Sequence, residues 1–218
     1  MVSFLEEYRF LIFTLNGVLV DHSELYELSF VTILEQYGIG PEISQRYYRS
    51  TAGTPVEERF KSLLPKRLIA KDPDLIDMLV QEYWESVTSV PNKLTNGVDE
   101  LVRDLRQRAM LLFITEEEDD PEGTMLELGI YHYFSSILGP AFDERREEHI
   151  CEFAKIAKLN VPRFCSQALM VSATVSDIEF ATKMRIDSFG ISTMVDPNLL
   201  NRAGALDTTS NVNDLLLL

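Results

Sequence analysis

Five short apolar runs, separated by segments of helical pattern, dominate the distribution of hydrophobic residues along the chain. The runs are continuous rather than alternating, which is typical of strands that are buried on both faces of a parallel sheet. They are Arg9–Phe13, Met110–Ile114, Ser135–Leu138, Ala168–Ser172 and Ser188–Ile191. Strands that alternate with helices predict βαβ units joined by right-handed crossovers, and therefore an α/β fold built on a parallel sheet.

One long interval breaks this alternation, because residues 22–93 contain helical patterns and no candidate strand. The predicted helices are Glu24–Tyr37, Glu42–Ser50, Pro55–Leu64 and Asp74–Thr88. We interpret the interval as a helical insert that folds as its own subdomain. The predicted domains are an α/β core of residues 1–21 and 94–218 and a helical insert of residues 22–93.

The composition is that of a folded globular protein and narrows the range of functions. None of the apolar runs approaches the roughly 18–20 residues that a membrane helix needs, so no membrane association is expected. The N-terminal segment has no basic stretch, which argues against a secretory signal. Cys151 and Cys165 lie in apolar-patterned segments and are interpreted as buried free thiols, so we expect a cytoplasmic protein.

The net charge of −15 is not balanced by any long basic run. Such a field repels a nucleic-acid backbone, which argues against binding of DNA or RNA through a broad surface. The charge favours solubility, and it suits a partner protein with a basic surface.

Motifs along the chain resemble those of the haloacid-dehalogenase-superfamily phosphatases, in the same order. The stretch Phe10–Asp21 resembles the first motif, an apolar strand followed by Asp-x-Asp-Gly-x-x-x-Asp. Leu112–Thr115 is similar to the second motif, a strand that ends in Ser or Thr, and Val171–Glu179 to the fourth, Gly-Asp-x-x-x-Asp-Ile. Asn96–Arg108 is similar to the helix that re-enters the family's core. The helical insert resembles the cap of the phosphoglycolate-phosphatase and β-phosphoglucomutase branch, so the resemblance implies a Rossmann-like parallel sheet core with an α-helical cap.

The resemblance also implies a chemistry. In that family the first Asp attacks phosphorus and forms an aspartyl-phosphate, and the Asp two residues later transfers protons. Mg²⁺ is held by the nucleophile, a backbone carbonyl and a motif-four Asp, while a motif-two Ser or Thr and a motif-three Lys bind the phosphoryl oxygens.

This sequence departs from the family at the catalytic positions. Thr14 stands at the nucleophile position, Asn16 at the acid/base position and Ala173 at the motif-four metal position. Each change removes a carboxylate, which leaves Asp177 as the sole remaining candidate metal ligand. We therefore expect no catalytic residue, a lost Mg²⁺ site and no cofactor.

Some polar residues of the motifs are retained. Thr115 and a motif-three arginine, either Arg145 or Arg146, are candidates for binding an anion. A structural role is the alternative for each: helix capping for Asp177, a loop hydrogen bond for Thr115, and a solvated charged helix start for the arginines.

An acidic run directly follows the second motif. It comprises Glu116, Glu117, Glu118, Asp119 and Asp120. The run should lie at the carboxyl end of a central strand, where ligands bind in open α/β sheets, and it would repel a phosphate dianion there. We expect it to dock a basic partner protein. A solvated loop and a divalent-cation site shared with Asp177 are the alternatives.

The simultaneous loss of nucleophile, acid/base and metal ligand favours a pseudoenzyme, an interaction, scaffold or regulatory protein built on an inactive phosphatase fold. Whether it forms a homo-oligomer stays open. One alternative is a divergent hydrolase that acts on small phosphorylated metabolites through a relocated nucleophile or metal. Another is a non-catalytic sensor that binds an anion without reacting.

Overall fold

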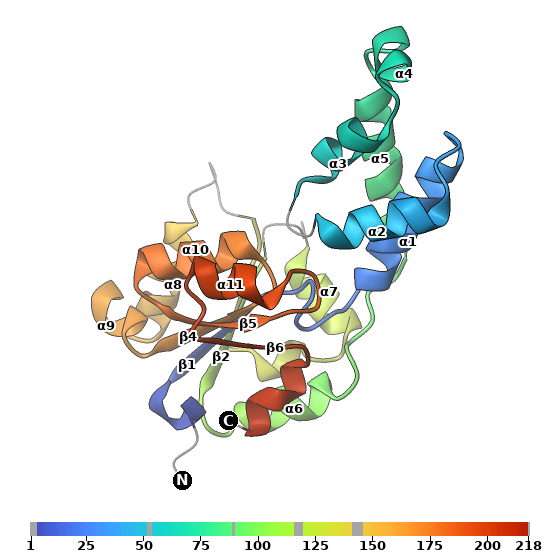
Figure 1. Ribbon diagram of the computed structural model, residues 1–218. Helices are drawn as coiled ribbons and strands as arrows, with labels where there is room; N and C mark the ends of the chain where they lie inside the picture. The colour runs from blue at the N-terminus through green and yellow to red at the C-terminus, as the bar shows by residue number, and fades with distance from the viewer. Residues whose placement is uncertain (1–3, 52–53, 89, 116–119, 141–145, 218) are drawn as a thin grey trace. The chain divides into compact units, whose positions relative to one another are not determined.

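The computed structural model describes residues 4–51, 54–88, 90–115, 120–140 and 146–217. The chain divides into two compact units, a core unit of Met1–Asp21 and Asn92–Leu218 and a cap unit of His22–Pro91 (Figure 1). Among the described helices, none combines the length and the apolarity that a membrane crossing requires.

A six-stranded parallel sheet forms the centre of the core unit, in the order β3-β2-β1-β4-β5-β6. The strands are β1 (Phe10–Phe13), β2 (Met110–Ile114), β3 (Ser136–Leu138), β4 (Ala168–Ser172), β5 (Asp187–Ile191) and β6 (Asp207–Thr209). This arrangement confirms the expected α/β fold with a Rossmann-like parallel sheet. β1 pairs with β2 on one side and with β4 on the other, so the strand order reverses at β1.

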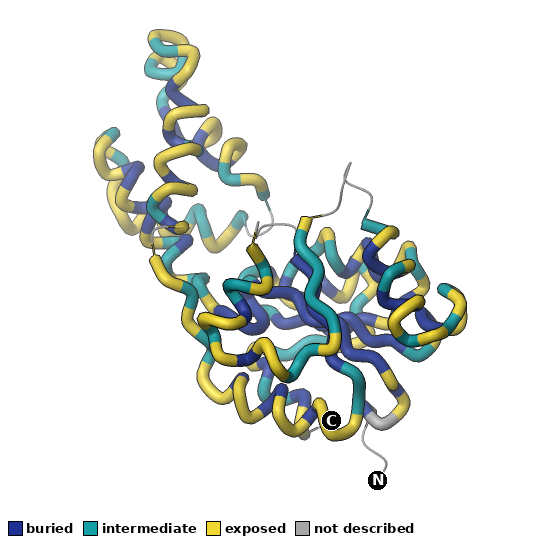
Figure 2. The backbone as a smooth tube through the Cα atoms, turned by 180° about the vertical axis from the view of Figure 1, so that it is seen from behind, coloured by how far each residue is buried: buried dark blue, intermediate teal, exposed yellow. Residues whose placement is uncertain are grey.

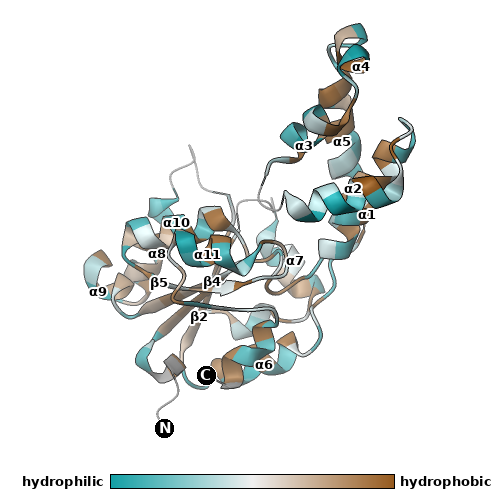
Figure 3. Cartoon of the chain, viewed as in Figure 1, coloured by the Kyte–Doolittle hydropathy of each residue, from teal (hydrophilic) through white to brown (hydrophobic). Residues whose placement is uncertain are grey.

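Helices cover both faces of this sheet. Successive strand residues point to opposite sides, and in the central strands they are apolar on both sides. Leu11 and Phe13 belong to a core cluster that includes residues of α6, whereas Phe10 and Ile12 belong to a second cluster with residues of α8, α9 and α10. The helices of the unit are α6 (Val98–Leu105), α7 (Pro121–Glu127), α8 (Glu147–Ile156), α9 (Val161–Cys165), α10 (Val175–Met184) and α11 (Pro197–Ala203), with 3-10 helices at Phe4–Glu7, Tyr131–Tyr133 and Val212–Leu217. Figure 2 shows the buried strands between the half-exposed helices, and Figure 3 shows that the central strands are apolar.

The cap unit is helical throughout its described residues. It consists of α1 (Ser23–Glu35), α2 (Pro41–Ser50), α3 (Val56–Leu63), α4 (Lys66–Lys71) and α5 (Leu75–Thr88). α1 packs against α2 and α5, and α3 packs against α5. Phe30 stacks on Phe60 with ring centroids 5.0 Å apart, and Arg59 lies 4.3 Å above the ring centre of Tyr48. Aromatic side chains thus contribute to the core of this unit beside the more numerous aliphatic ones.

Two expectations need correction. Cys165 is buried as predicted, but Cys151 is exposed, because the buried residues of α8 are His149, Ile150, Phe153 and Ala154 and Cys151 lies outside this set. The hydrophobic pattern also did not predict β6, since the three residues of this strand are all polar and none of them is fully buried.

Candidate functional site

The chain turns sharply at the carboxyl end of β1, and this turn carries two of the catalytic positions, Thr14 and Asn16. Gly17 has a φ of +76°, a left-handed conformation that residues with a side chain rarely adopt. Its amide donates to the carbonyl of Val20 at 2.6 Å, and its own carbonyl accepts a hydrogen bond from the Thr193 hydroxyl at 2.7 Å. The turn is thus fixed on both sides by hydrogen bonds.

A cavity of about 260 Å³ opens beside this turn, at the carboxyl ends of β1, β2 and β4. Its described lining residues are Thr14, Leu15, Asn16, Ile114, Thr115, Arg146, Thr174, Ser176 and Asp177. In open parallel sheets, ligands bind at the place where the strand order reverses, and this cavity lies there. The position of the cavity therefore marks it as the candidate functional site.

An ion pair inside the core unit shapes this cavity. A terminal guanidinium nitrogen of Arg146 lies 2.5 Å from one carboxylate oxygen of Asp177, and the Ser172 hydroxyl donates to the other oxygen at 2.6 Å. Both charged side chains are mostly buried, with 18% of Arg146 and 15% of Asp177 exposed. Arg146 also lies 4.5 Å above the ring centre of Phe180, a favourable cation–π distance. The Asp177 carboxylate is consequently engaged on both of its oxygens.

Neighbouring contacts hold the two partners in place. The Thr174 side chain caps α10 by accepting a hydrogen bond from the Asp177 amide at 3.2 Å. Next to Arg146, the Glu147 carboxylate accepts a hydrogen bond from the Lys183 ammonium at 2.6 Å, which ties the first turn of α8 to α10. That hydrogen bond also lowers the pKa of Glu147 from its usual value.

Thr14 has an unusual environment for a hydroxyl group. Its backbone amide donates to the Val171 carbonyl at 3.2 Å, whereas its hydroxyl oxygen is buried and makes no hydrogen bond to any described residue. The residue is 8% exposed and lines the cavity. Buried polar groups are nearly always paired in folded proteins, so this hydroxyl is a place where a bound molecule would find a partner.

The structure brings several of the sequence-derived candidates together. Thr14, Asn16, Thr115, Arg146 and Asp177 all line the same cavity. Of the two arginines that are candidates for the motif-three position, Arg146 lines the cavity and Arg145 lies outside the described residues.

The remaining candidates are not part of the cavity. Ala173 is fully buried and packs instead against the turn at Gly17. The acidic residues Glu116, Glu117, Glu118 and Asp119 lie outside the described residues. Asp120 caps α7 by accepting from the Gly123 amide at 3.0 Å, which is a structural role.

Thr174 and Ser176 line the cavity although no sequence motif singled them out. For Thr174 a usable signal was present, because Thr174-Val175-Ser176-Asp177 has the spacing of a helix start whose first residue caps the fourth. Ser176 shows no comparable signal.

The family's Mg²⁺ does not fit the donors of this cavity. Mg²⁺ prefers octahedral oxygen coordination with at least one or two carboxylates. Asp177 contributes the one carboxylate among the described lining residues, and its oxygens already accept from Arg146 and Ser172. No group of three or more His, Cys, Asp or Glu side chains in the described part of the chain is placed to hold a metal ion.

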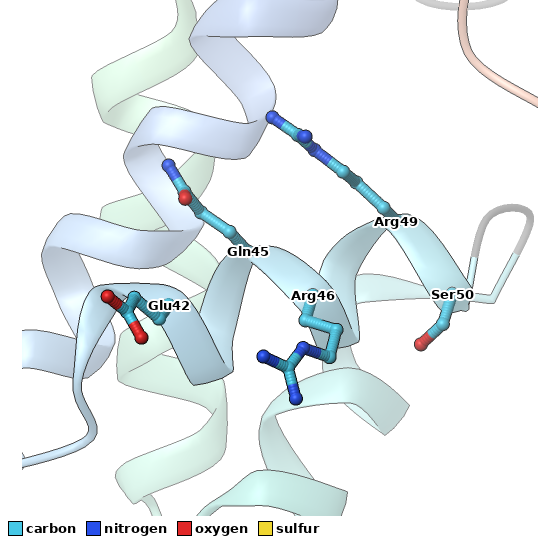
Figure 4. A pocket seen from close by; sticks show the side chains of 5 residues that line it. All are labelled: Glu42, Gln45, Arg46, Arg49 and Ser50. Atoms are coloured by element: carbon cyan, nitrogen blue, oxygen red, sulfur yellow. The ribbon is translucent and has the colours of Figure 1, made fainter.

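A second hollow lies on the cap unit but offers a poorer site. Its lining residues, Glu42, Gln45, Arg46, Arg49 and Ser50, all come from α2 (Figure 4). The guanidinium of Arg49 is paired with both carboxylate oxygens of Glu27, each at 2.7 Å. A surface built from one helix, with its best-placed cation already neutralised, does not enclose a ligand.

Comparisons with known proteins agree with this geometry. The model of the family described as haloacid dehalogenase-like hydrolase matches residues 11–191. A haloacid dehalogenase-like hydrolase family protein from Streptococcus pneumoniae is 20% identical over 97% of this chain and 98% of its own, with a TM-score of 0.72. A putative phosphatase from Clostridium difficile is 21% identical over 97% and 99% of the two chains, with a TM-score of 0.71.

A third solved structure carries the same fold. It is a predicted phosphoglycolate phosphatase from Haemophilus somnus, 17% identical over 97% of each chain, with a TM-score of 0.70. No curated protein sequence matches the chain closely enough to count. Because the family model spans more than half of the chain and the strand order and cavity agree with it, the chain belongs to the haloacid dehalogenase-like hydrolase family.

Proposed function

We propose that this chain is a non-hydrolytic member of its family, a binding or regulatory protein that uses an inactive phosphatase fold. The observation that carries the proposal is the state of Asp177. It is the one carboxylate among the described lining residues, and Arg146 and Ser172 occupy its oxygens. The described lining residues therefore supply neither a carboxylate nucleophile nor a carboxylate that is available to a metal ion.

The described residues of this cavity lack the groups that phosphate ester hydrolysis requires. Thr14 offers a hydroxyl, but the ionisable groups among the described lining residues are a guanidinium and an ion-paired carboxylate, neither of which is a suitable base. An alcohol without a base is a poor nucleophile near neutral pH. The Asn16 amide does not ionise near neutral pH and cannot act as a general acid or base, and the loss of such a group costs about 10²–10⁴ in rate in enzymes that depend on it.

A protein partner with a basic surface is the interaction that suits this chain. The net charge of −15 and the acidic residues 116–120 favour such a partner over nucleic acid. A homo-oligomer is compatible with the same role, and we place the protein in the cytoplasm as part of the proposal. A pull-down from native extract tests the partner, with a variant of the acidic residues 116–120 neutralised to Asn and Gln as the control.

The second candidate is a divergent hydrolase acting on small phosphorylated metabolites. Two observations favour it: the cavity persists at the family's usual position, and matched structures are described as phosphatases. A non-catalytic anion sensor that uses Thr115 and Arg146 is a related candidate. Both depend on the same cavity. Turnover of a phosphate ester would distinguish the hydrolase from the first proposal, and binding of an anion would distinguish the sensor.

A phosphatase assay decides between these functions. Purified protein is incubated with p-nitrophenyl phosphate and a panel of sugar phosphates in the presence of Mg²⁺ or Mn²⁺, alongside Thr14→Val prepared in the same way. We expect the wild type and Thr14→Val to give the same background rate. Turnover that is abolished by Thr14→Val would overturn the proposal and establish Thr14 as a nucleophile.

Restoring the missing carboxylates is a complementary test. We expect the triple variant Thr14→Asp, Asn16→Asp and Ala173→Asp to gain little activity, because Arg146 still pairs with Asp177 and keeps this carboxylate from binding a metal ion. Strong turnover by this variant would show that the carboxylates alone limit the wild type.

A further inference from the structure

The charges that line the cavity cancel. Among its described lining residues, Arg146 and Asp177 are the ionised side chains, and they form a direct ion pair. The remaining polar lining groups are uncharged: the hydroxyls of Thr14, Thr115, Thr174 and Ser176 and the amide of Asn16. The described lining of the cavity is thus rich in hydrogen-bonding groups and carries no net charge.

This balance disfavours charged ligands. An anion that approaches Arg146 meets the carboxylate that already accepts from it, and it must displace that carboxylate or lie beside a like charge. A cation that approaches Asp177 meets the guanidinium in the same way. A charged ligand of either sign therefore binds more weakly here than it would at an unpaired residue of opposite charge. Separating the ion pair would leave one of its partly buried charges without its partner, which is costly.

The hydroxyl of Thr14 points instead to a ligand with hydroxyl groups of its own. It is buried, it lines the cavity, and it has no hydrogen-bond partner among the described residues. A hydroxyl both donates and accepts one hydrogen bond or more, so a ligand hydroxyl satisfies it in either sense. The Thr174 hydroxyl accepts a hydrogen bond from the Asp177 amide and can still donate one to a further group of the ligand.

The volume limits the size of that ligand. At about 260 Å³ the cavity is smaller than the sites of roughly 300–1,000 Å³ that hold drug-sized molecules. We propose that the cavity binds an uncharged, polyhydroxylated small molecule, a free sugar or polyol of about monosaccharide size, without a metal ion. The inference rests on the proposed non-hydrolytic function and names the class of ligand that this function serves.

Ligand-observed NMR and isothermal titration calorimetry test the inference on the full chain. The probes are D-ribose, D-glucose and myo-inositol as uncharged polyols, and inorganic phosphate as the anion, all without divalent metal. We expect a Kd in the millimolar range or tighter for at least one polyol and no binding of phosphate. Thr14→Val, which keeps the shape but removes the hydroxyl, is expected to weaken the polyol about five- to tenfold.

Two further variants make the test specific. Asp177→Asn removes the carboxylate that pairs with Arg146, so phosphate binding should appear in this variant while polyol binding weakens. Thr88→Val, an exposed threonine at the end of α5, is the matched control and should bind every probe as the wild type does. Thermal unfolding of each variant checks that it is folded.

The inference is overturned if the wild type binds phosphate but no polyol, if none of the probes binds at millimolar concentration, or if Thr14→Val binds the polyol as well as the wild type does. Its failure is distinct from failure of the proposed function. Metal-dependent turnover of phosphate esters would refute that function whichever probe binds.

Discussion

Replacing Gly17 by alanine probes the turn that places Thr14 and Asn16 at the cavity. A methyl group on Gly17 would lie 2.6 Å from the side-chain carbon of Ala173 and 2.8 Å from both the sulfur of Met194 and the hydroxyl of Thr193. Separations of this kind are too short for stable contact, so the chain has to shift. Ala173 follows directly on β4 and has no flexible side chain with which to move away.

The expected loss of stability has two parts. A residue with a side chain at a φ of +76° costs about 1–2 kcal/mol, and overpacking a filled site costs about 1–3 kcal/mol more. Gly129 separates these parts, because it lies in the same unit with a φ of +75° and has no atom within 4 Å of an added methyl group. We expect Gly129→Ala to lose about 1–2 kcal/mol and Gly17→Ala about 2–5 kcal/mol.

Urea denaturation of the wild type and both variants measures these values. Far-UV circular dichroism follows the whole chain, and the fluorescence of Trp84, the one tryptophan of the sequence, follows the cap unit. The difference between the two variants isolates the steric part. If Gly17→Ala proves no less stable than Gly129→Ala, the close packing of Ala173 against this turn is wrong, and with it the reason for glycine at this position.

The remaining predictions concern groups away from the cavity. In the native protein, iodoacetamide should modify the exposed Cys151 and spare Cys165, whose thiol is buried; denaturation should make both react, and equal native rates would contradict the assigned burial. Burial also raises the pKa of Cys165, so its contribution to stability is complete below the ordinary thiol pKa of about 8.5 and is lost as the pH rises through the raised value; Cys165→Ala should remove this alkaline dependence in urea titrations at several pH values. Tyr8→Phe removes the hydrogen bond that the Tyr8 hydroxyl donates to Asp187 at 2.8 Å and should cost about 1 kcal/mol in the same assay, whereas an unchanged midpoint would show that the bond adds nothing.

The boundaries of the five predicted strands, β1 to β5, agree with the structure to within one residue, and the apolar sequence of the central strands explains why they could be recognised. β1, β2 and β4 are buried almost completely and therefore read as continuous hydrophobic runs. β6 was missed because it is an edge strand of polar residues that pairs with β5 alone, so its formation depends on a neighbour that the local pattern does not reveal. Tertiary context decides such a strand.

Four short helices, α4, α7, α9 and α11, were not predicted, although the sequence held a signal for α9 and α11. α9 begins after Asn160 and α11 after Asp196, and each of these residues caps its helix with a side-chain hydrogen bond. A proline in the first turn follows in both cases, which is the expected start of a helix. Helices of five and seven residues are too short to show a hydrophobic period, so only the caps could have revealed them.

The location of the cavity could be predicted from the order of the motifs, but its electrostatics could not. The carboxyl ends of parallel strands meet at one edge of the sheet, and this property brings Thr14 and Thr115 together. The pairing of Arg146 with Asp177 joins residues 31 positions apart on different helices, and it decides that the retained carboxylate is engaged. No local pattern distinguishes that outcome from a carboxylate available to a metal.

The environment of position 14 also predicts that an aspartate there, as the family has it, lowers the stability of this chain. Thr14→Asp introduces a carboxyl at a position that is 8% exposed, in a cavity that already holds the carboxylate of Asp177. Burial raises the pKa of the new group above its unfolded value of about 3.9, whereas the paired charges of Asp177 and Arg146 largely offset each other. A raised pKa favours the folded state only at low pH, so the variant should match Thr14→Asn in acid and become less stable as the pH rises, by about 1–3 kcal/mol at pH 7.

Thr14→Asn is the control for this prediction because it is of similar size and never ionises, and urea titrations of both variants between acid and neutral pH give the comparison. Added Mg²⁺ supplies the decisive step. With Asp177 held by Arg146 and Ser172, the two carboxylates do not form a magnesium site, and millimolar Mg²⁺ should leave the deficit in place. If Mg²⁺ instead restores the stability of Thr14→Asp, the ion pair yields to the metal, and a carboxylate at position 14 together with Asp177 suffices to bind it.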